Sequence, residues 1–185
     1  YFLNSYSWSI LADVATEEQI RTMLQIVKRY LKTEAGLKLC TLVQFERLRV
    51  NTGTALYFPG DRENGGVFKH AAMMATVASL KAAKLVQDED LARELAELAF
   101  FMIDRTVPYR TMDDPFVIKG NPRFCTQYNN SETGEHIGPM LSGTASWLTL
   151  AVFEFLGMDV QADTMDFAPI LRPGQKHMAY TVRLA

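Results

Sequence analysis

The sequence predicts a mostly α-helical fold, and three observations support this prediction. Apolar residues recur at spacings of three and four along several long segments. Residues that cap helices precede two of these segments, and a glycine follows another. The two-residue alternation typical of strands occurs near the carboxyl end. Hydrophobic residues make up 48% and charged residues 22% of the 185 residues, which indicates a folded globular protein.

Two helices are expected near the start of the chain. Residues 7–14 place apolar side chains on one helical face, with Trp8 among them. Thr16 and Gln19 have the spacing of a capping box, which begins a second helix that continues to about Leu31. Residues 37–50 show no clear period, and we expect them to be extended or irregular.

The middle of the chain is expected to hold a glycine-rich loop followed by two helices. Residues 51–66 have the composition of a loop, and residues 67–86 are rich in Ala, Met and Leu, which predicts a buried helix. Lys69 is expected on the surface of that helix. Asp88 is expected to cap the next helix, which runs to about Ile103.

A long loop at residues 106–141 contains four of the seven prolines. Loops of this length inside compact domains are uncommon and are usually functional. An apolar helix is expected at residues 143–156, ended by Gly157, and two strands are expected at 165–171 and 178–184. An α/α barrel contains pairs of helices joined by functional loops. The pattern alone, however, predicts no more than a mostly α fold.

Composition and charge argue against several classes of function. The formal net charge is −2 and the basic residues are scattered, so we expect no nucleic-acid partner. No apolar run approaches the length of a membrane span. Cys40 and Cys125 lack metal-ligand or disulfide-framework spacing, which favours a reducing, cytoplasmic environment and no metal site. The chain opens on an apolar segment without an initiator Met, so we expect a fragment of a longer protein.

The first candidate site lies at residues 62–70. Two consecutive glycines, Gly65 and Gly66, allow the backbone to approach a ligand closely, while Arg62, Glu63 and His70 supply charge and hydrogen bonds. The structural alternative is a flexible entry to a helix with a solvated Arg–Glu pair.

The second candidate is the start of the helix expected at residues 143–156. Ser142, Gly143 and Thr144 stand where free N–H groups and the positive end of the helix dipole favour an anion such as phosphate. A simple N-cap explains Ser142 or Thr144 equally well. Trp147 is expected in the core and not as a platform for a sugar.

The third candidate is the loop at residues 124–136, which is rich in amide and hydroxyl side chains. Such groups recognise sugar hydroxyls by hydrogen bonds. Gln127 lies within it, and His136 is expected at the surface. Asn129 begins an N-glycosylation pattern, which matters in a secreted protein alone. No nucleophile elbow, Walker loop, dinucleotide fingerprint or zinc motif is present, so an enzymatic interpretation depends on the three segments together.

Taken in order along the chain, three motifs resemble the inverting phosphorylases of glycoside hydrolase family 94. That family includes cellobiose, cellobionic acid, chitobiose and β-1,2-glucan phosphorylases and the C-terminal region of cyclic β-1,2-glucan synthases. The motifs are Tyr1-Phe2-Leu3-Asn4-Ser5-Tyr6-Ser7-Trp8, then Arg62-Glu63-Asn64-Gly65-Gly66 followed by His70, then Leu141-Ser142-Gly143-Thr144-Ala145-Ser146-Trp147.

The resemblance implies a fold and a division of the chain. Residues 1–162 would be the C-terminal helices of an (α/α)6 catalytic barrel, and residues 163–185 would begin a small C-terminal β domain. It also implies a homodimeric full-length protein without a cofactor, which takes inorganic phosphate and a β-linked disaccharide or oligoglucan as substrates.

The resemblance also implies roles for six residues. His70, Ser142 and Gly143 would bind phosphate, although many relatives carry Thr where Ser142 stands. Arg62 and Glu63 would contact the sugars that flank the scissile bond, and relatives often have Lys at the position of Arg62. Gln127 would read the glucosyl unit near the phosphate. The loop at residues 106–122 is longer than in cellobiose phosphorylase, which leaves the substrate open.

The chemistry expected of such a site is phosphorolysis with inversion, which releases α-glucose 1-phosphate. Phosphate is already a nucleophile, so a carboxylic acid that protonates the leaving oxygen suffices. In the family this acid is an aspartate upstream of the first motif, so it would lie outside this chain, and the isolated 185 residues are predicted to be inactive. The alternatives are a phosphorylase-like domain of a cyclic β-glucan synthase, a hydrolase of related fold, and a non-catalytic carbohydrate-binding module.

Overall fold

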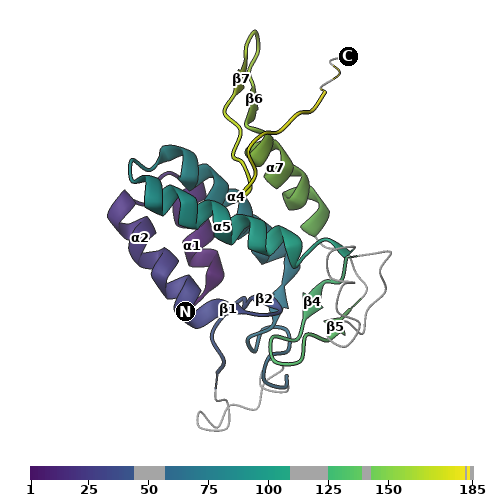
Figure 1. Cartoon of the computed structure of the whole chain (residues 1–185). Coiled ribbons are helices and arrows are strands. Elements are labelled where there is room, and N and C mark those ends of the chain that lie inside the picture. Colours follow the sequence, from purple (N-terminus) through teal and green to yellow (C-terminus); the bar gives the residue numbers. More distant parts are fainter. Residues whose placement is uncertain (44–56, 109–124, 139–142, 182, 184–185) are drawn as a thin grey trace.

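The computed structural model describes residues 1–43, 57–108, 125–138, 143–181 and 183. It is mostly helical with small antiparallel sheets, as the sequence predicts, and this composition is consistent with part of an α/α barrel followed by a small β element (Figure 1). Within the described residues, no helix is both long and apolar enough to cross a bilayer.

The first two helices lie close to where the sequence places them. Helix α1 spans Leu3–Leu11, so it begins earlier than expected, and Trp8 lies on its exposed side. Helix α2 spans Glu17–Ile26 and opens with the predicted capping box, in which Thr16 and Gln19 satisfy each other's N–H groups. A π-helical turn, η1, continues it over Val27–Leu31.

Helix α4, at the centre of the fold, spans Lys69–Leu85 and packs against α1, α5 and α7. Its many alanines allow three helices to approach it closely, which explains why it is apolar on nearly every side. A buried hydrogen bond of 2.7 Å between the Tyr6 and Ser79 hydroxyls joins α1 to α4. Burial raises the pKa of Tyr6, so its phenol stays protonated and remains able to donate.

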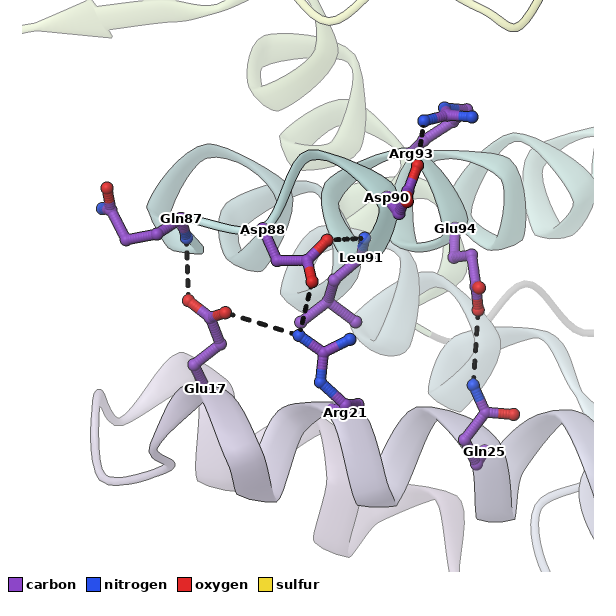
Figure 2. Close-up of polar contacts among 9 residues, drawn as sticks. All are labelled: Glu17, Arg21, Gln25, Gln87, Asp88, Asp90, Leu91, Arg93 and Glu94. Atoms are coloured by element: carbon purple, nitrogen blue, oxygen red, sulfur yellow. Dashed lines mark hydrogen bonds and ion pairs between the residues drawn. The ribbon is translucent and has the colours of Figure 1, made fainter.

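Helix α5 spans Glu89–Asp104 and begins at the predicted cap, where the Asp88 carboxylate accepts a hydrogen bond from Leu91 N–H at 2.9 Å. The same carboxylate accepts one from Arg21 of α2 at 2.8 Å. Figure 2 shows this carboxylate between the two helices, at the centre of a row of polar contacts along their surface. The core of the described structure lies between α1, α2, α4 and α5, and its fully enclosed side chains include Leu3, Leu24, Leu37, Met73 and Leu95.

Short antiparallel strands join the loops to the helices. Strands β1 and β2 pair next to the end of η1, and β3, β4 and β5 form a sheet beside the start of α4. The bounds are Lys32–Thr33 for β1, Gly36–Leu37 for β2, Val67–Phe68 for β3, Tyr128–Asn129 for β4 and His136–Ile137 for β5. The start of the predicted helix at residues 67–86 is therefore a strand.

Helix α7 spans Thr144–Leu156 and ends at Gly157, whose left-handed φ of 71° matches the predicted stop. A hairpin follows, made of β6 (Met158–Val160) and β7 (Met165–Phe167), which projects away from the helices in Figure 1. The expectation of a strand at residues 178–184 was wrong for the described part of that range, because β7 pairs with β6 across a short turn instead. The hairpin crosses the predicted domain boundary between residues 162 and 163, and that boundary stays a prediction.

Candidate functional site

The loop that carries Arg62 and Glu63 folds around a close approach of its own backbone. Gly66 N–H donates to the Arg62 carbonyl at 2.8 Å, and a methyl group on Gly66 would lie 2.5 Å from the Arg62 nitrogen. Arg62 itself has a left-handed φ of 41°. The tight turn therefore explains the glycine in structural terms and leaves the Arg62 and Glu63 side chains exposed.

The buried side chain of Asn64 joins the Arg62–Glu63 turn to two neighbouring segments of backbone. The Asn64 amide donates to the Tyr57 carbonyl at 3.0 Å, and its oxygen accepts from Val43 N–H at 3.1 Å. The guanidinium of Arg62 lies 5.1 Å from the centre of the Tyr57 ring, a cation–π distance. These contacts hold the Arg62–Glu63 turn in one orientation.

The small sheet brings Gln127 to the start of α4. Phe68 of β3 is opposite Tyr128 of β4, and Lys69 N–H donates to the Gln127 carbonyl at 3.0 Å. Gln127 N–H donates in turn to the Gly138 carbonyl at 3.1 Å. The ladder therefore places Gln127 beside the residue that precedes His70 in sequence.

Tyr128 connects the sheet to the Arg62–Glu63 turn. Its hydroxyl donates to Glu63 Oε1 at 3.0 Å, and its ring stacks on Phe68 with centroids 4.5 Å apart. Burial, together with the neighbouring Glu63 carboxylate, raises the pKa of Tyr128, so the phenol remains a hydrogen-bond donor. Phe68 also contacts His70, with ring centroids 5.4 Å apart.

His70 packs against the beginning of α7. A methyl group on Gly143 would lie 2.5 Å from His70 Cε1 and 2.7 Å from Nε2, so only a glycine leaves room for the imidazole at this distance. Gly143 occupies the N-cap position of α7, and no side chain among the described residues caps this helix. The free N–H groups of the first turn therefore begin next to a half-buried imidazole.

Thr144 adds a second polar group at this helix start. Its side chain is 1% exposed, and within the described residues its hydroxyl has no hydrogen-bond partner. A helix N-terminus attracts anions through its N–H groups and its dipole. The arrangement of His70, Gly143 and the first turn of α7 therefore suits an anion.

Lys69 was expected at the surface of its helix, and this expectation was wrong. Its side chain is 2% exposed, and its ammonium donates to the main-chain carbonyl of Arg105, the C-cap residue of α5. Burial lowers the pKa of Lys69 to about 8, with nearby Arg105 acting in the same direction and Cys125 opposing it. The first residue of α4 lies beside the end of α5 and the segment that carries Cys125 and Gln127, which explains its burial.

His136 was also expected at the surface and is instead half-buried, with its Nδ1 atom enclosed and without a partner among the described residues. Burial, and then the charge of Lys69, lowers the pKa of His136. No three His, Cys, Asp or Glu side chains gather as metal ligands in the described ranges.

The predicted site residues come from separate segments and are joined by one continuous series of contacts. It runs from Glu63 through Tyr128 and Phe68 to His70, and from there to Gly143. Arg62 adjoins it through the turn, and Gln127 adjoins it through the sheet. Ser142 lies outside the described residues.

Two features of the site were not predicted from the sequence, namely the contact of Tyr128 with Glu63 and the buried position of Lys69. An available signal for Lys69 was its spacing of three and four from Ala72 and Met73, both of which are enclosed. No local signal distinguishes Tyr128 from other loop tyrosines, because its partner Glu63 is distant in sequence.

Comparison with known proteins places this arrangement in a family. No curated protein matches the chain. The sequence model described as "Glycosyl hydrolase 94 superfamily, catalytic domain" matches residues 1–157, which include the described site residues named above. The chain therefore belongs to the glycosyl hydrolase 94 superfamily of glycoside-processing enzymes.

Proposed function

We propose that this chain is part of an inverting phosphorylase, in which phosphate held by His70, Ser142 and the amino end of α7 cleaves a β-glucosidic bond. The observation that supports this proposal is the contact between the His70 imidazole and Gly143. An imidazole and a group of uncapped helix N–H donors together provide hydrogen bonds to several oxygens of one anion. Water needs a carboxylate base to become a nucleophile, whereas phosphate does not.

In the proposed reaction, a phosphate oxygen attacks the anomeric carbon of the glucosyl unit from the face opposite the leaving sugar. The new bond forms between that oxygen and the anomeric carbon, and the bond to the leaving oxygen breaks. A general acid gives its proton to the leaving oxygen. The products are α-glucose 1-phosphate, with inverted configuration, and the shortened sugar.

The sugar side of the site is assigned to Arg62, Glu63 and Gln127. The Glu63 carboxylate can accept hydrogen bonds from sugar hydroxyls, and the Gln127 amide can both donate and accept them. The Tyr128 hydroxyl donates to one oxygen of that carboxylate at 3.0 Å. We assign the general acid to an aspartate outside these 185 residues, so the chain alone is expected to be inactive.

A release assay tests the proposal. The full-length protein is incubated with a panel of β-linked disaccharides and oligoglucans, with and without phosphate, and glucose 1-phosphate and free glucose are measured. Phosphate-dependent release of glucose 1-phosphate is expected. Release of free glucose at the same rate with and without phosphate would mean hydrolysis, and no release from any glycoside in the panel would favour a binding module.

Variants of Ser142 address the phosphate side separately. Ser142→Thr keeps the hydroxyl and is expected to retain activity, while Ser142→Val has a similar shape without the hydroxyl and is expected to raise the phosphate requirement. Equal phosphate dependence of the two variants would contradict a role for this hydroxyl.

A further inference from the structure

Lys69 connects two of the segments that form the site. Its main-chain N–H donates to the Gln127 carbonyl at 3.0 Å, and its ammonium donates to the Arg105 carbonyl at the end of α5. The next residue in sequence is His70. Lys69 therefore fixes the first turn of α4 at two points, one on the β4 side and one on α5.

The position of the ammonium has a clear electrostatic reason. The carboxyl end of a helix carries unpaired carbonyls and a partial negative charge, which favours a cation. Arg105 is the C-cap residue of α5, so the Lys69 ammonium lies at the negative end of that helix. This contact joins the beginning of one helix to the end of its neighbour.

Stability alone does not account for a lysine at this position. Burial lowers the pKa of Lys69 to about 8, so the charged side chain is less favourable in the folded protein than it is in water. A methionine has a similar length and fills buried space without a charge. Lys81, on the same helix, is by contrast partly exposed and donates to the Leu11 carbonyl and to Asp13, at 3.2 and 2.8 Å.

We propose that Lys69 is a positioning residue for the phosphate site: its ammonium, held on the carboxyl end of α5, keeps His70 against Gly143 and Gln127 beside the start of α4. This inference rests on the proposed function. Lys69 acts through His70 and does not touch phosphate. A shift of about 1 Å in a binding group changes rates by up to about a hundredfold, so a small loss of order in this turn is measurable.

Three lysine variants of the full-length enzyme test the inference. Lys69→Met removes the donor and the charge, Lys69→Gln keeps a donor without the charge, and Lys81→Met is the matched control at the distant end of the same helix. We expect Lys69→Met to raise the phosphate KM on the order of tenfold or more without loss of thermal stability at pH 7. Lys69→Gln is expected to recover part of this effect, and Lys81→Met is expected to leave the phosphate KM unchanged.

His70→Ala in the same assay distinguishes a failure of the Lys69 positioning role from a failure of the proposed phosphate site. If His70→Ala raises the phosphate KM and Lys69→Met does not, the positioning role is wrong and the proposed function stands. If His70→Ala leaves the phosphate KM unchanged, the phosphate site itself is wrong. A Lys69→Met protein that loses stability while its phosphate KM stays at the wild-type value would show a structural role alone and overturn the inference.

The wild type supplies a second measurement if Lys69→Met does not fold. Among the described groups around Lys69, Arg105 is the neighbouring cation, burial raises the pKa of the Cys125 thiol from 9.0, and burial lowers that of His136 from 6.5. Both shifts move these titrations away from the range between about pH 7.5 and about pH 9. We expect the phosphate KM to rise across this range as Lys69 loses its proton. A phosphate KM that stays constant across the range would overturn the inference.

Discussion

The imidazole of His70 and the backbone of Gly143 are in direct contact although they lie in different helices. His70 belongs to the first turn of α4 and Gly143 is the N-cap residue of α7. A methyl group on Gly143 would fall within 3 Å of three atoms of the His70 ring. This contact is the geometric basis for the proposed phosphate site.

Replacement of Gly143 by Ala is expected to displace His70. The backbone of Gly143 has a φ of −65°, which alanine adopts without strain, so the collision with the imidazole is the main consequence. We expect phosphate-dependent activity to fall on the order of a hundredfold while the protein remains folded. Steady-state kinetics and thermal unfolding measure the two effects. The control Thr149→Ala, an exposed position six residues later in α7, is expected to behave as wild type, and a fully active Gly143→Ala enzyme would contradict the geometry.

Replacement of Tyr128 by Phe tests the sugar side of the site. The substitution removes the hydrogen bond to Glu63 and keeps the ring on Phe68. A hydrogen bond to a charged group contributes about 1.5–3 kcal/mol, so kcat/KM for the glycoside is expected to fall on the order of tenfold, with the phosphate KM unchanged. Tyr180→Phe is the matched control, because the Tyr180 hydroxyl also donates one hydrogen bond, to the Leu156 carbonyl at 2.7 Å. Equal kinetics for Tyr128→Phe and Tyr180→Phe would show that the Tyr128 hydroxyl has no role in binding the glycoside.

Local signals in the sequence were sufficient to predict several helix starts and ends, but not which side chains are buried or which strands pair. The capping box at Thr16, the cap at Asp88 and the stop at Gly157 depend on neighbouring residues, and the structure confirms them. The burial of Lys69 depends on the end of α5, which is distant in sequence. The strand expected at residues 178–184 was wrong because Met158 and Val160, directly after Gly157, offered β7 a nearer partner.

The Asp88 carboxylate is expected to link stability to acid pH. Hydrogen bonds from Leu91 N–H and Arg21 lower the pKa of Asp88 from its ordinary value of 3.8. Its stabilising contribution is therefore present above that value and is lost as pH falls below it. We expect Asp88→Ala to lower the thermal midpoint at neutral pH and to flatten its acid dependence, with the exposed Asp90 as the control position. The same midpoint and the same acid dependence in Asp88→Ala and wild type would contradict this role.

The buried Lys69 ammonium is expected to link stability to alkaline pH with the opposite sign from a surface salt bridge. Its pKa is lowered from 10.5 to about 8, so the folded state releases the proton first and stability rises as pH increases above about 8. The shift corresponds to a contribution of up to about 3 kcal/mol over the full range. Denaturant unfolding at about pH 7.5 and about pH 9 measures it, and Lys69→Met is expected to lack the increase. The free energy of unfolding should rise with pH in the wild type and not in Lys69→Met. A rise of the same size in both proteins would come from another group and would contradict the assignment to Lys69.

The phosphate dependence of His70→Ala in the full-length enzyme tests the central claim most directly. We expect a phosphate KM raised about tenfold or more and a lower kcat, because the imidazole donates hydrogen bonds to the attacking anion. The glycoside KM, measured at saturating phosphate, is predicted to change little. A folded His70→Ala enzyme with the phosphate kinetics of the wild type would contradict the proposed site.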